Sequence, residues 1–503
     1  MNSSVNQISM TLSNRQQKQY RCLCIVLQAV NETCKTRNGI RYTSGDTCSD
    51  ASLTDYQKFL CKLAQICDNE KGSACITALV ALKGPLGPEY LFVSNSRKTS
   101  ELERTKVFLF DLIEYVGSNP ERLAPKALQK QILGRIFEFN FPRLVVYLKQ
   151  LCAALEGCIS CCQNAQDTER LDTLNALRLL QDRAQFPRDM TSSSNAKQRF
   201  LRNCEDLIKA IQNSKAGEID NIIDRHIRDD EPQSSFYWSQ LRHYLGRLHS
   251  FRQASEIIFN ASEKWNSLFK NFSVEYIRSS RLQKFCHPRP SYSSPNDIVE
   301  AAFPEHDLSH YETDIQELRE HGLDKEIQKQ EQEMPSKAQV HCEVKMHHHL
   351  VKNDKTRPCD FWNGVMFIAT SKPTCRLCHY YFQDDENDFQ VQPPHMNLYP
   401  RWRLPDVEGP EDKAGIRRHQ ELMDDILEHM QNDTLKILQR KFPQWKRNDS
   451  RTDSRTWPSG TRDGADSRTP PPQHHMYPSP VTDGESFVME MEYDDCRGVA
   501  VSI

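Results

Sequence analysis

The chain has 503 residues, a hydrophobic content of 38% and a formal net charge of −3 at pH 7. This length suits two packed units and a tail, and the apolar content is sufficient for real cores. The balanced charge does not indicate a nucleic-acid-binding protein, and the lack of an N-terminal apolar segment or an 18-residue apolar run argues against secretion and against a membrane partner. The 18 cysteines are therefore expected to be reduced thiols or metal ligands in the cytoplasm or nucleus.

The first hundred residues predict a helix followed by a β-hairpin. Residues 1–20 are polar and are expected to be mobile. Apolar residues then recur at helical spacing over 56–67, which predicts a helix. Two apolar runs, 75–82 and 90–95, flank a turn at 84–88 that contains two glycines and two prolines. This pattern is typical of two strands joined by a turn.

The next long region predicts helices. Its periodic segments contain few glycines or prolines, as helices require. They are 107–116, 144–155, 171–180, 200–211 and 239–272.

Residues 251–292 combine basic and aromatic side chains, a mixture that could follow a phosphate backbone and stack bases. The aromatic residues recur at helical spacing, so the stronger interpretation is that they are core residues and the charges form a solvated face.

The most specific motif begins with His341-Cys342-Glu343 and is completed by Cys375 and Cys378. One His, two Cys and a nearby Glu suit a hydrolytic zinc site. Positions i and i+3 share one face of a helix, and Pro373 suits a helix start, so we expect both thiols in a first turn. The positive helix N-terminus would lower the thiol pKa values and favour the thiolates that zinc requires.

The segments around this motif predict a crossover unit. Residues 344–350 indicate a helix, and 365–369 form a short apolar run typical of a buried parallel strand. Helix, strand and second helix would bring two helix N-termini to one edge of a sheet, where open α/β sheets bind ligands.

On these motifs the sequence resembles the cytidine deaminase-like superfamily and, within it, the OTT-type deaminase family common in fungi. The resemblance implies that His341, Cys375 and Cys378 are zinc ligands and that Glu343 is the general acid/base. The chain departs from the wider superfamily in two places, because Cys342 stands where Ala is usual and Pro373 does not directly precede the first Cys.

The resemblance also implies a fold, a mixed α/β sheet sandwiched by helices. Such a domain needs a helix and a hairpin before its His-bearing helix, which the charged, Gln-rich stretch at 300–340 does not offer. We therefore expect the hairpin near 75–97 to join the zinc half across a large all-α insertion. Asn95 would then contact the substrate, with His395 as a secondary candidate. The alternative is that the hairpin belongs to a separate N-terminal domain.

The expected organisation has six parts, which end in an amphipathic helix over 416–438 and a Ser-, Asp- and Pro-rich tail expected to be disordered. The parts are 1–50, a partly mobile N-terminal segment; 51–100, the first part of the deaminase-like domain; 101–334, the helical insertion; 335–410, the zinc-binding part; 411–444, the C-terminal helix; and 445–503, the tail.

Three competing motifs have weaker support. The three histidines at 347–349 with Asp360 fit the ligand spacing of a JAMM-type metalloprotease, but Arg357 stands where that family has Ser, so a solvated helix face is the stronger interpretation. The segment 375–379 spells the C-x-x-C-H of haem attachment, which a chain without a secretory signal is not expected to use. The cysteines at 158, 161 and 162 are expected to be small buried side chains of a helix.

The preferred hypothesis is zinc-dependent hydrolytic deamination of a nucleobase, cytosine or adenine type, either free or in single-stranded nucleic acid. The alternative is an inactive deaminase-like scaffold with a structural zinc, in which Cys342 or Cys359 closes the metal tetrahedron. Protein partners would bind the C-terminal helix and tail.

Overall fold

The computed structural model describes residues 12–37, 53–163, 168–190, 193–216, 219–229, 232–284, 292–383, 388–407 and 412–443. All of these residues fall in the first of two compact units, Met1–Trp457. The predicted tail over 445–503 and the first eleven residues lie outside the described part of the chain.

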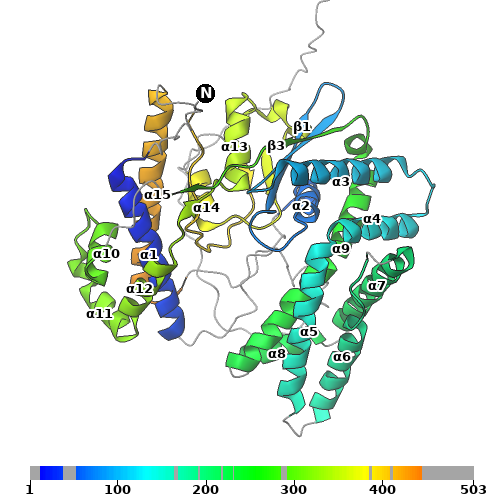
Figure 1. Cartoon of the computed structure of the whole chain (residues 1–503), viewed down its shortest axis with the longest axis horizontal. Coiled ribbons are helices and arrows are strands. Elements are labelled where there is room, and N and C mark those ends of the chain that lie inside the picture. The colour runs from blue at the N-terminus through cyan, green and yellow to red at the C-terminus, as the bar shows by residue number, and fades with distance from the viewer. Residues whose placement is uncertain are drawn as a thin grey trace, which may run out of the picture. The chain divides into compact units, whose positions relative to one another are not determined.

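A five-stranded mixed sheet in the order β3-β2-β1-β6-β7 is the centre of the fold (Figure 1). β1 runs antiparallel to β2 and β6, whereas β2 with β3 and β6 with β7 are parallel. The predicted mixed α/β class is thereby confirmed. The strands are β1 (Thr77–Lys83), β2 (Pro88–Ser94), β3 (Ser273–Ile277), β6 (Phe367–Thr370) and β7 (Gln390–Val391), with β4 (Gln283–Lys284) and β5 (Lys337–Ala338) in a separate two-stranded sheet.

The hairpin of β1 and β2 lies in the same sheet as the strand from the zinc half. β1 pairs with β6 through Ala78 opposite Thr370 and Leu79 opposite Ala369. At the turn, a Cβ on Gly87 would lie 2.3 Å from the Asn271 carbonyl oxygen, so only glycine allows this close approach. Segments far apart in sequence thus build one sheet.

Both faces of this sheet are covered, because side chains alternate along each strand. Leu79 and Ala81 of β1 pack in the core that contains α2 (Asp55–Cys67). On the other face, Ala78, Val80 and Leu82 pack against Met346 and Leu350 of α13 (Cys342–Lys352). The predicted helices over 56–67 and 344–350 therefore sandwich the sheet. The capping box of Thr54 and Gln57 fixes the start of α2.

The region between β2 and β3 is helical, as the sequence predicted. α9 packs against α4, α5, α8 and α2, and the expected periodic segments fall in α3, α5, α6 and α7. The helices are α3 (Thr99–Ser118), α4 (Pro125–Phe139), α5 (Phe141–Gln163), α6 (Thr168–Ala184), α7 (Ser194–Ala216), α8 (Ile219–Asp229) and α9 (Pro232–Lys264).

Two details of this region differ from the sequence prediction. The helix expected over 239–272 ends at Lys264 and is followed by the short 3₁₀ helix η2 (Asn266–Phe269) and then by β3, which was not predicted. In addition, Phe141–Cys162 of α5 is long and apolar enough to cross a membrane by length and composition. Its Leu148 and Leu151 are nevertheless fully buried in the core of the helical region.

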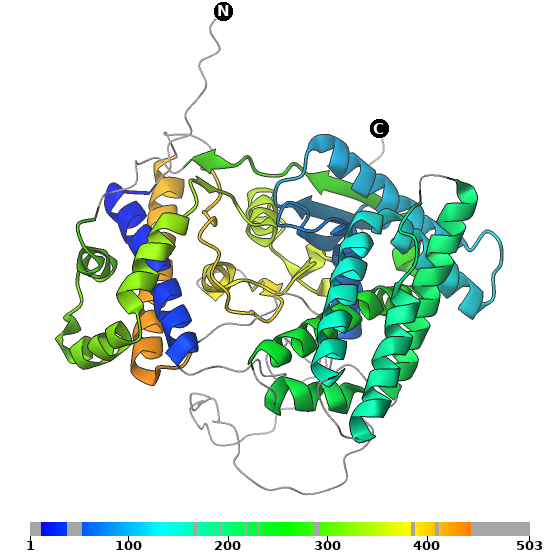
Figure 2. The same cartoon turned by 60° about the horizontal axis from the view of Figure 1, so that its bottom comes forward.

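A second core gathers α1 (Asn14–Arg37) with helices from the C-terminal half. Figures 1 and 2 show α1 beside α15 (Lys413–Arg440), and their contact buries Ile426 and Met430 of α15. The helix predicted over 416–438 is confirmed, whereas the expectation that residues 1–20 are mobile is wrong from Asn14 onward. The other helices of this group are α10 (Pro295–Ala302), α11 (Glu312–Glu320), α12 (Leu323–Glu333) and α14 (Arg376–Gln383), with η3 (Leu308–Tyr311) between α10 and α11. The short 3₁₀ helices η4 (Pro358–Asp360) and η5 (Trp362–Gly364) precede β6 and contact β1 instead.

Candidate metal centre and active site

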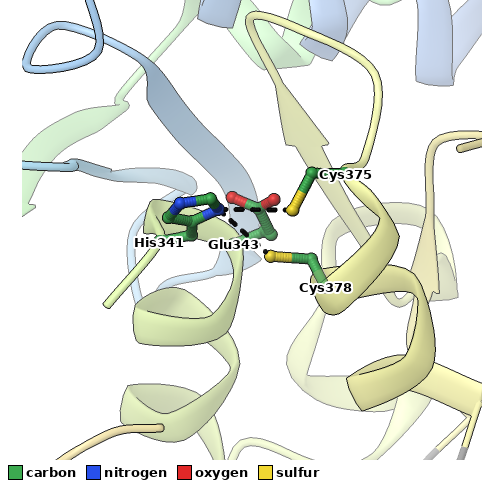
Figure 3. Close-up of side chains that lie close together, drawn as sticks. All are labelled: His341, Glu343, Cys375 and Cys378. Carbon is green, nitrogen blue, oxygen red and sulfur yellow. Dashed lines mark hydrogen bonds between the residues drawn. The ribbon is translucent and has the colours of Figure 1, made fainter. Parts of the chain in front are cut away.

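Four side chains of the sequence motif meet at the N-termini of two helices. His341 is the N-cap of α13 and has an extended backbone (φ −70°, ψ 151°), while Glu343 lies in the first turn. Cys375 directly precedes α14, and Cys378 lies on its first turn. The ligand atoms of these four buried residues all lie within 4.8 Å of one another (Figure 3).

The spacing of the donors fits a tetrahedral zinc ion. Nδ1 of His341 lies 3.5 Å from Sγ of Cys375 and 3.4 Å from Sγ of Cys378. Zinc binds imidazole nitrogen at about 2.0–2.1 Å and thiolate sulfur at about 2.3 Å, so two such donors at a tetrahedral angle lie about 3.5 Å apart. One imidazole and two thiols are also the donor types that zinc prefers.

Charge is distributed unevenly over the two thiols. Burial opposes ionisation of Cys375, but the hydrogen bond from Cys378 and the neighbouring His341 lower its pKa to about 6. Burial and the adjacent Cys375 instead raise the pKa of Cys378 well above its ordinary value. Burial also disfavours the charged form of His341, yet Cys375 raises its pKa overall. From the sequence we expected the helix N-terminus to lower the pKa of both thiols. The pKa is lowered for Cys375 alone and is raised for Cys378.

Asn95, at the end of β2, holds the start of α13 in place. Its Oδ1 accepts the backbone N–H of Cys342 at 2.7 Å, and its Nδ2 donates to the Ser73 carbonyl at 3.0 Å. Asn95 also lines the cavity that reaches His341 and Glu343. Its predicted contact with a substrate stays a prediction, but its position at this cavity is compatible with one.

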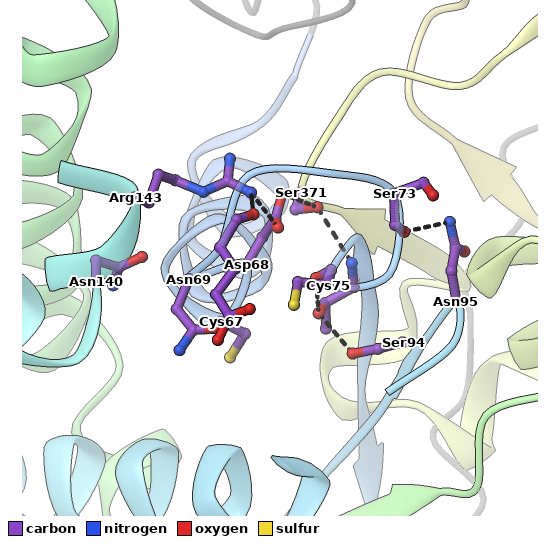
Figure 4. A network of polar contacts seen from close by, with 12 residues as sticks. Cys67, Asp68, Asn69, Ser73, Cys75, Ser94, Asn95, Asn140, Arg143 and Ser371 are labelled. Atoms are coloured by element: carbon purple, nitrogen blue, oxygen red, sulfur yellow. Dashed lines mark hydrogen bonds and ion pairs between the residues drawn. The ribbon is translucent and has the colours of Figure 1, made fainter. Parts of the chain in front are cut away.

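A buried polar network supports the loop between β6 and Cys375 (Figure 4). The Ser371 hydroxyl donates to Oδ2 of Asp68 at 3.2 Å and accepts the backbone N–H of Thr77 at 3.1 Å. The other carboxylate oxygen of Asp68 forms an ion pair with Arg143 of α5. The helical region is thereby connected to the loop that leads into Cys375 and Cys378.

A cavity of about 480 Å³ is lined by His341, Glu343 and Cys375 of this cluster. His395, the secondary candidate, lies in its wall, is 2% exposed, and accepts the backbone N–H of Asn397 through Nδ1 at 3.0 Å. Tyr399 lies between the two histidines, with ring centroids 5.7 Å from His395 and 6.3 Å from His341. Lys372 and Arg401 add positive charge to the lining.

The cavity also contains residues that the sequence did not indicate. Gln28 comes from α1, Gln330 and Glu333 come from α12, and Gln339 precedes the His341 motif. None of them belongs to a recognisable motif, and the tertiary packing of α1 and α12 brings Gln28, Gln330 and Glu333 to the cavity. They could not have been found from local sequence.

The competing metal sites are not formed. Within the described residues, the group around His341 is the one cluster of three or more metal-ligating side chains. His347 is buried, with Nδ1 2.8 Å from the Tyr381 hydroxyl, so the solvated face expected at 347–349 is wrong for this residue. Sγ of Cys342 lies 3.3 Å from Oε2 of Glu343, outside the four-residue cluster, and Cys359 is exposed.

The cysteines of α5 behave as expected from their sequence context. Cys158 and Cys162 are buried in the core of the helical region, and Cys161 is half-buried.

The sheet, the two facing helix N-termini and the His/Glu/Cys/Cys cluster together form an α/β unit with a candidate metal site. Residues 340–406 match the model of the OTT_1508-like deaminase family, which belongs to the deaminase-like superfamily. The resemblance predicted from the motifs is thus confirmed for this segment, which contains all four clustered residues. Comparisons with curated proteins and with solved structures gave no match.

Proposed function

We propose that the protein is a zinc-dependent hydrolase that removes the exocyclic amino group of a nucleobase. The observation that carries this proposal is the convergence of His341, Cys375, Cys378 and Glu343 in one buried cluster, three of whose members, all but Cys378, line a cavity. The match of residues 340–406 to a deaminase family supports the same reaction class.

His341, Cys375 and Cys378 would hold the metal. A zinc ion there would supply a Lewis acid that makes water a nucleophile at neutral pH. The three donors leave one tetrahedral position for water or substrate, which is typical of catalytic zinc sites.

Glu343 moves the proton. Its carboxylate accepts a proton from the attacking water and donates it to the departing amino group. The C–N bond then breaks, ammonia leaves, and the ring carbon keeps the oxygen as a carbonyl. The position of Glu343 in the first turn of α13 places its carboxylate beside the other three side chains.

A second candidate is a structural zinc site in a non-catalytic scaffold. The specific observation in its favour is that Glu343 lies inside the same 4.8 Å cluster and could be the fourth ligand. Four protein ligands would close the tetrahedron and leave no place for water.

The Glu343→Gln variant separates the two candidates. If Glu343 transfers protons, the variant keeps its zinc and releases no ammonia from cytosine- or adenine-containing substrates. Loss of zinc would favour the closed site, and retained turnover would refute the mechanism. Glu320→Gln is the control, because Glu320 is exposed on α11 and far in sequence from the motif.

We also propose a cytoplasmic or nuclear location and a nucleobase-containing partner, either free or in a single strand. The cysteines among the described residues are free thiols, as a reducing compartment favours. Recovery of the protein in a secreted or membrane fraction of cells would contradict the location. We also propose that protein partners bind α15. Deletion of α15 should then abolish the co-purification of these partners.

A further inference from the structure

We propose that Gln28, Gln330 and Gln339 form a carboxamide wall that recognises the hydrogen-bonding edge of the base. This inference rests on the proposed deamination and assigns the residues that select its substrate. All three line the cavity that contains His341 and Glu343, yet none of them lies in the segment 340–406 that matches the deaminase family.

Gln339 provides the strongest evidence. It follows β5 and forms an extended bridge with Trp402, so side chains alternate on either side of this segment. Val340 packs in the second core, whereas Gln339 and His341 both line the cavity. Its backbone is fully used, because its N–H donates to the Arg401 carbonyl at 2.6 Å and its carbonyl accepts from Arg403 at 3.0 Å.

The side chain of Gln339 has unused hydrogen-bonding capacity. The residue is only 4% exposed, and within the described part of the chain its carboxamide has no hydrogen-bond partner. The carboxamide is not among the fully buried polar groups that lack a partner, so it is accessible from the cavity, where it offers two N–H donors and one carbonyl acceptor. A ligand in the cavity would satisfy these groups.

Gln330 and Gln28 extend the wall. Gln330 is 6% exposed, and its Nε2 donates to Oε1 of Glu326 at 2.7 Å, which fixes the carboxamide and leaves its carbonyl oxygen available. Gln28 is half-buried and has no side-chain hydrogen bond among the described residues. α1 is held against this wall because the Tyr20 hydroxyl donates to the Trp402 carbonyl at 3.1 Å.

Neutral carboxamides match the chemistry of a base. Cytosine and adenine each have an acceptor ring nitrogen next to the amino-bearing carbon, and cytosine has a carbonyl oxygen on the carbon beyond that nitrogen. Carboxamides can donate to these acceptors and accept from the amino group. The cavity of about 480 Å³ falls within the range of about 300–1,000 Å³ for small-molecule sites, so a sugar also has room.

The decisive test compares Gln339→Leu with Gln332→Leu, an exposed glutamine of α12 that does not line the cavity. Binding is measured by calorimetry in the Glu343→Gln background, with cytidine, adenosine and a short single-stranded oligonucleotide that contains both bases. Turnover is measured as ammonia release in the otherwise unchanged protein, and zinc content in every variant.

Loss of a hydrogen bond from a buried polar group predicts that Gln339→Leu weakens binding and lowers kcat/KM roughly ten- to a hundredfold, with zinc unchanged. Gln332→Leu should have no effect. Unchanged affinity in Gln339→Leu, or no binding of any of the three probes to the parent protein, would overturn the carboxamide wall. Binding that depends on Gln339 without any ammonia release would instead refute the deaminase reaction alone.

Discussion

Removal of Arg143 tests how strongly the helical region supports the loop between β6 and Cys375. Arg143 and Asp68 form an ion pair whose side chains are 5% and 1% exposed. Burial alone would lower the pKa of the Arg143 guanidinium, but Asp68 and Tyr147 raise it above its ordinary value. Arg143→Met keeps the apolar stem of the side chain and leaves the Asp68 carboxylate buried, with the Ser371 hydroxyl as a remaining donor.

An uncompensated buried charge typically destabilises a protein by about 3–5 kcal/mol, a large part of a total stability of about 5–15 kcal/mol. Urea unfolding followed by circular dichroism should show this loss for Arg143→Met. Adding Asp68→Asn should restore part of this lost stability, because the unpaired charge is then removed.

Lys264→Met is the control, since Lys264 and Asp55 form an ion pair whose side chains are 57% and 68% exposed. It should cost less than about 1 kcal/mol. A loss for Arg143→Met no larger than that of the control would refute the reasoning.

Three further predictions concern the surroundings of the metal centre. Asn95→Ala should lower stability by about 1–3 kcal/mol in urea unfolding, because the Cys342 N–H loses its acceptor; an unchanged midpoint would count against this anchor. Cys342→Ala should retain zinc in elemental analysis, and loss of zinc would make Cys342 a ligand. Burial and the charges of Lys345 and His419 lower the pKa of His348 to about 4. The unfolded chain therefore binds more protons between pH 6.5 and pH 4, and stability should fall by about 3 kcal/mol as the pH drops through this window. His348→Gln should flatten that dependence, and an equal slope in both proteins would exclude His348 as its source.

The elements around the candidate metal site, α13, β6 and α14, could be predicted because each is indicated by a pattern of neighbouring residues. The His341 motif, the apolar run before Cys375 and the helical periodicity after His341 each determine an element from neighbouring residues. The hairpin of β1 and β2 was equally visible, since its turn contains two glycines and two prolines. Placing this hairpin beside β6 required the resemblance to a known domain, because strand pairing between distant segments leaves no local signal.

The missed elements lack such local signals. α1 is buried nearly all round between Cys22 and Val30, so it has no polar face and shows no amphipathic period. β3 has only five residues and follows Phe269 of η2, which packs against Phe59 of α2. The apolar spacing that precedes β3 therefore continues the pattern of the helix before it. The strand identity of β3 depends on parallel pairing with β2.

The residues of the carboxamide wall also could not be predicted from local sequence. Gln28 and Gln339 are more than half the chain apart, and only the packing of α1 on the segment around Trp402 brings them to one cavity. The charge state of the thiols was also out of reach, because it depends on mutual burial and on the contact between Cys375 and Cys378.

The zinc content of the purified protein and of Cys375→Ser tests the central claim most directly. Cys359→Ser is the matched control, because Cys359 is exposed and lies outside the cluster. The account predicts about one zinc per chain in the parent and control proteins and its loss from Cys375→Ser. Folded parent protein without zinc, or equal zinc in Cys375→Ser, would contradict the proposed metal centre.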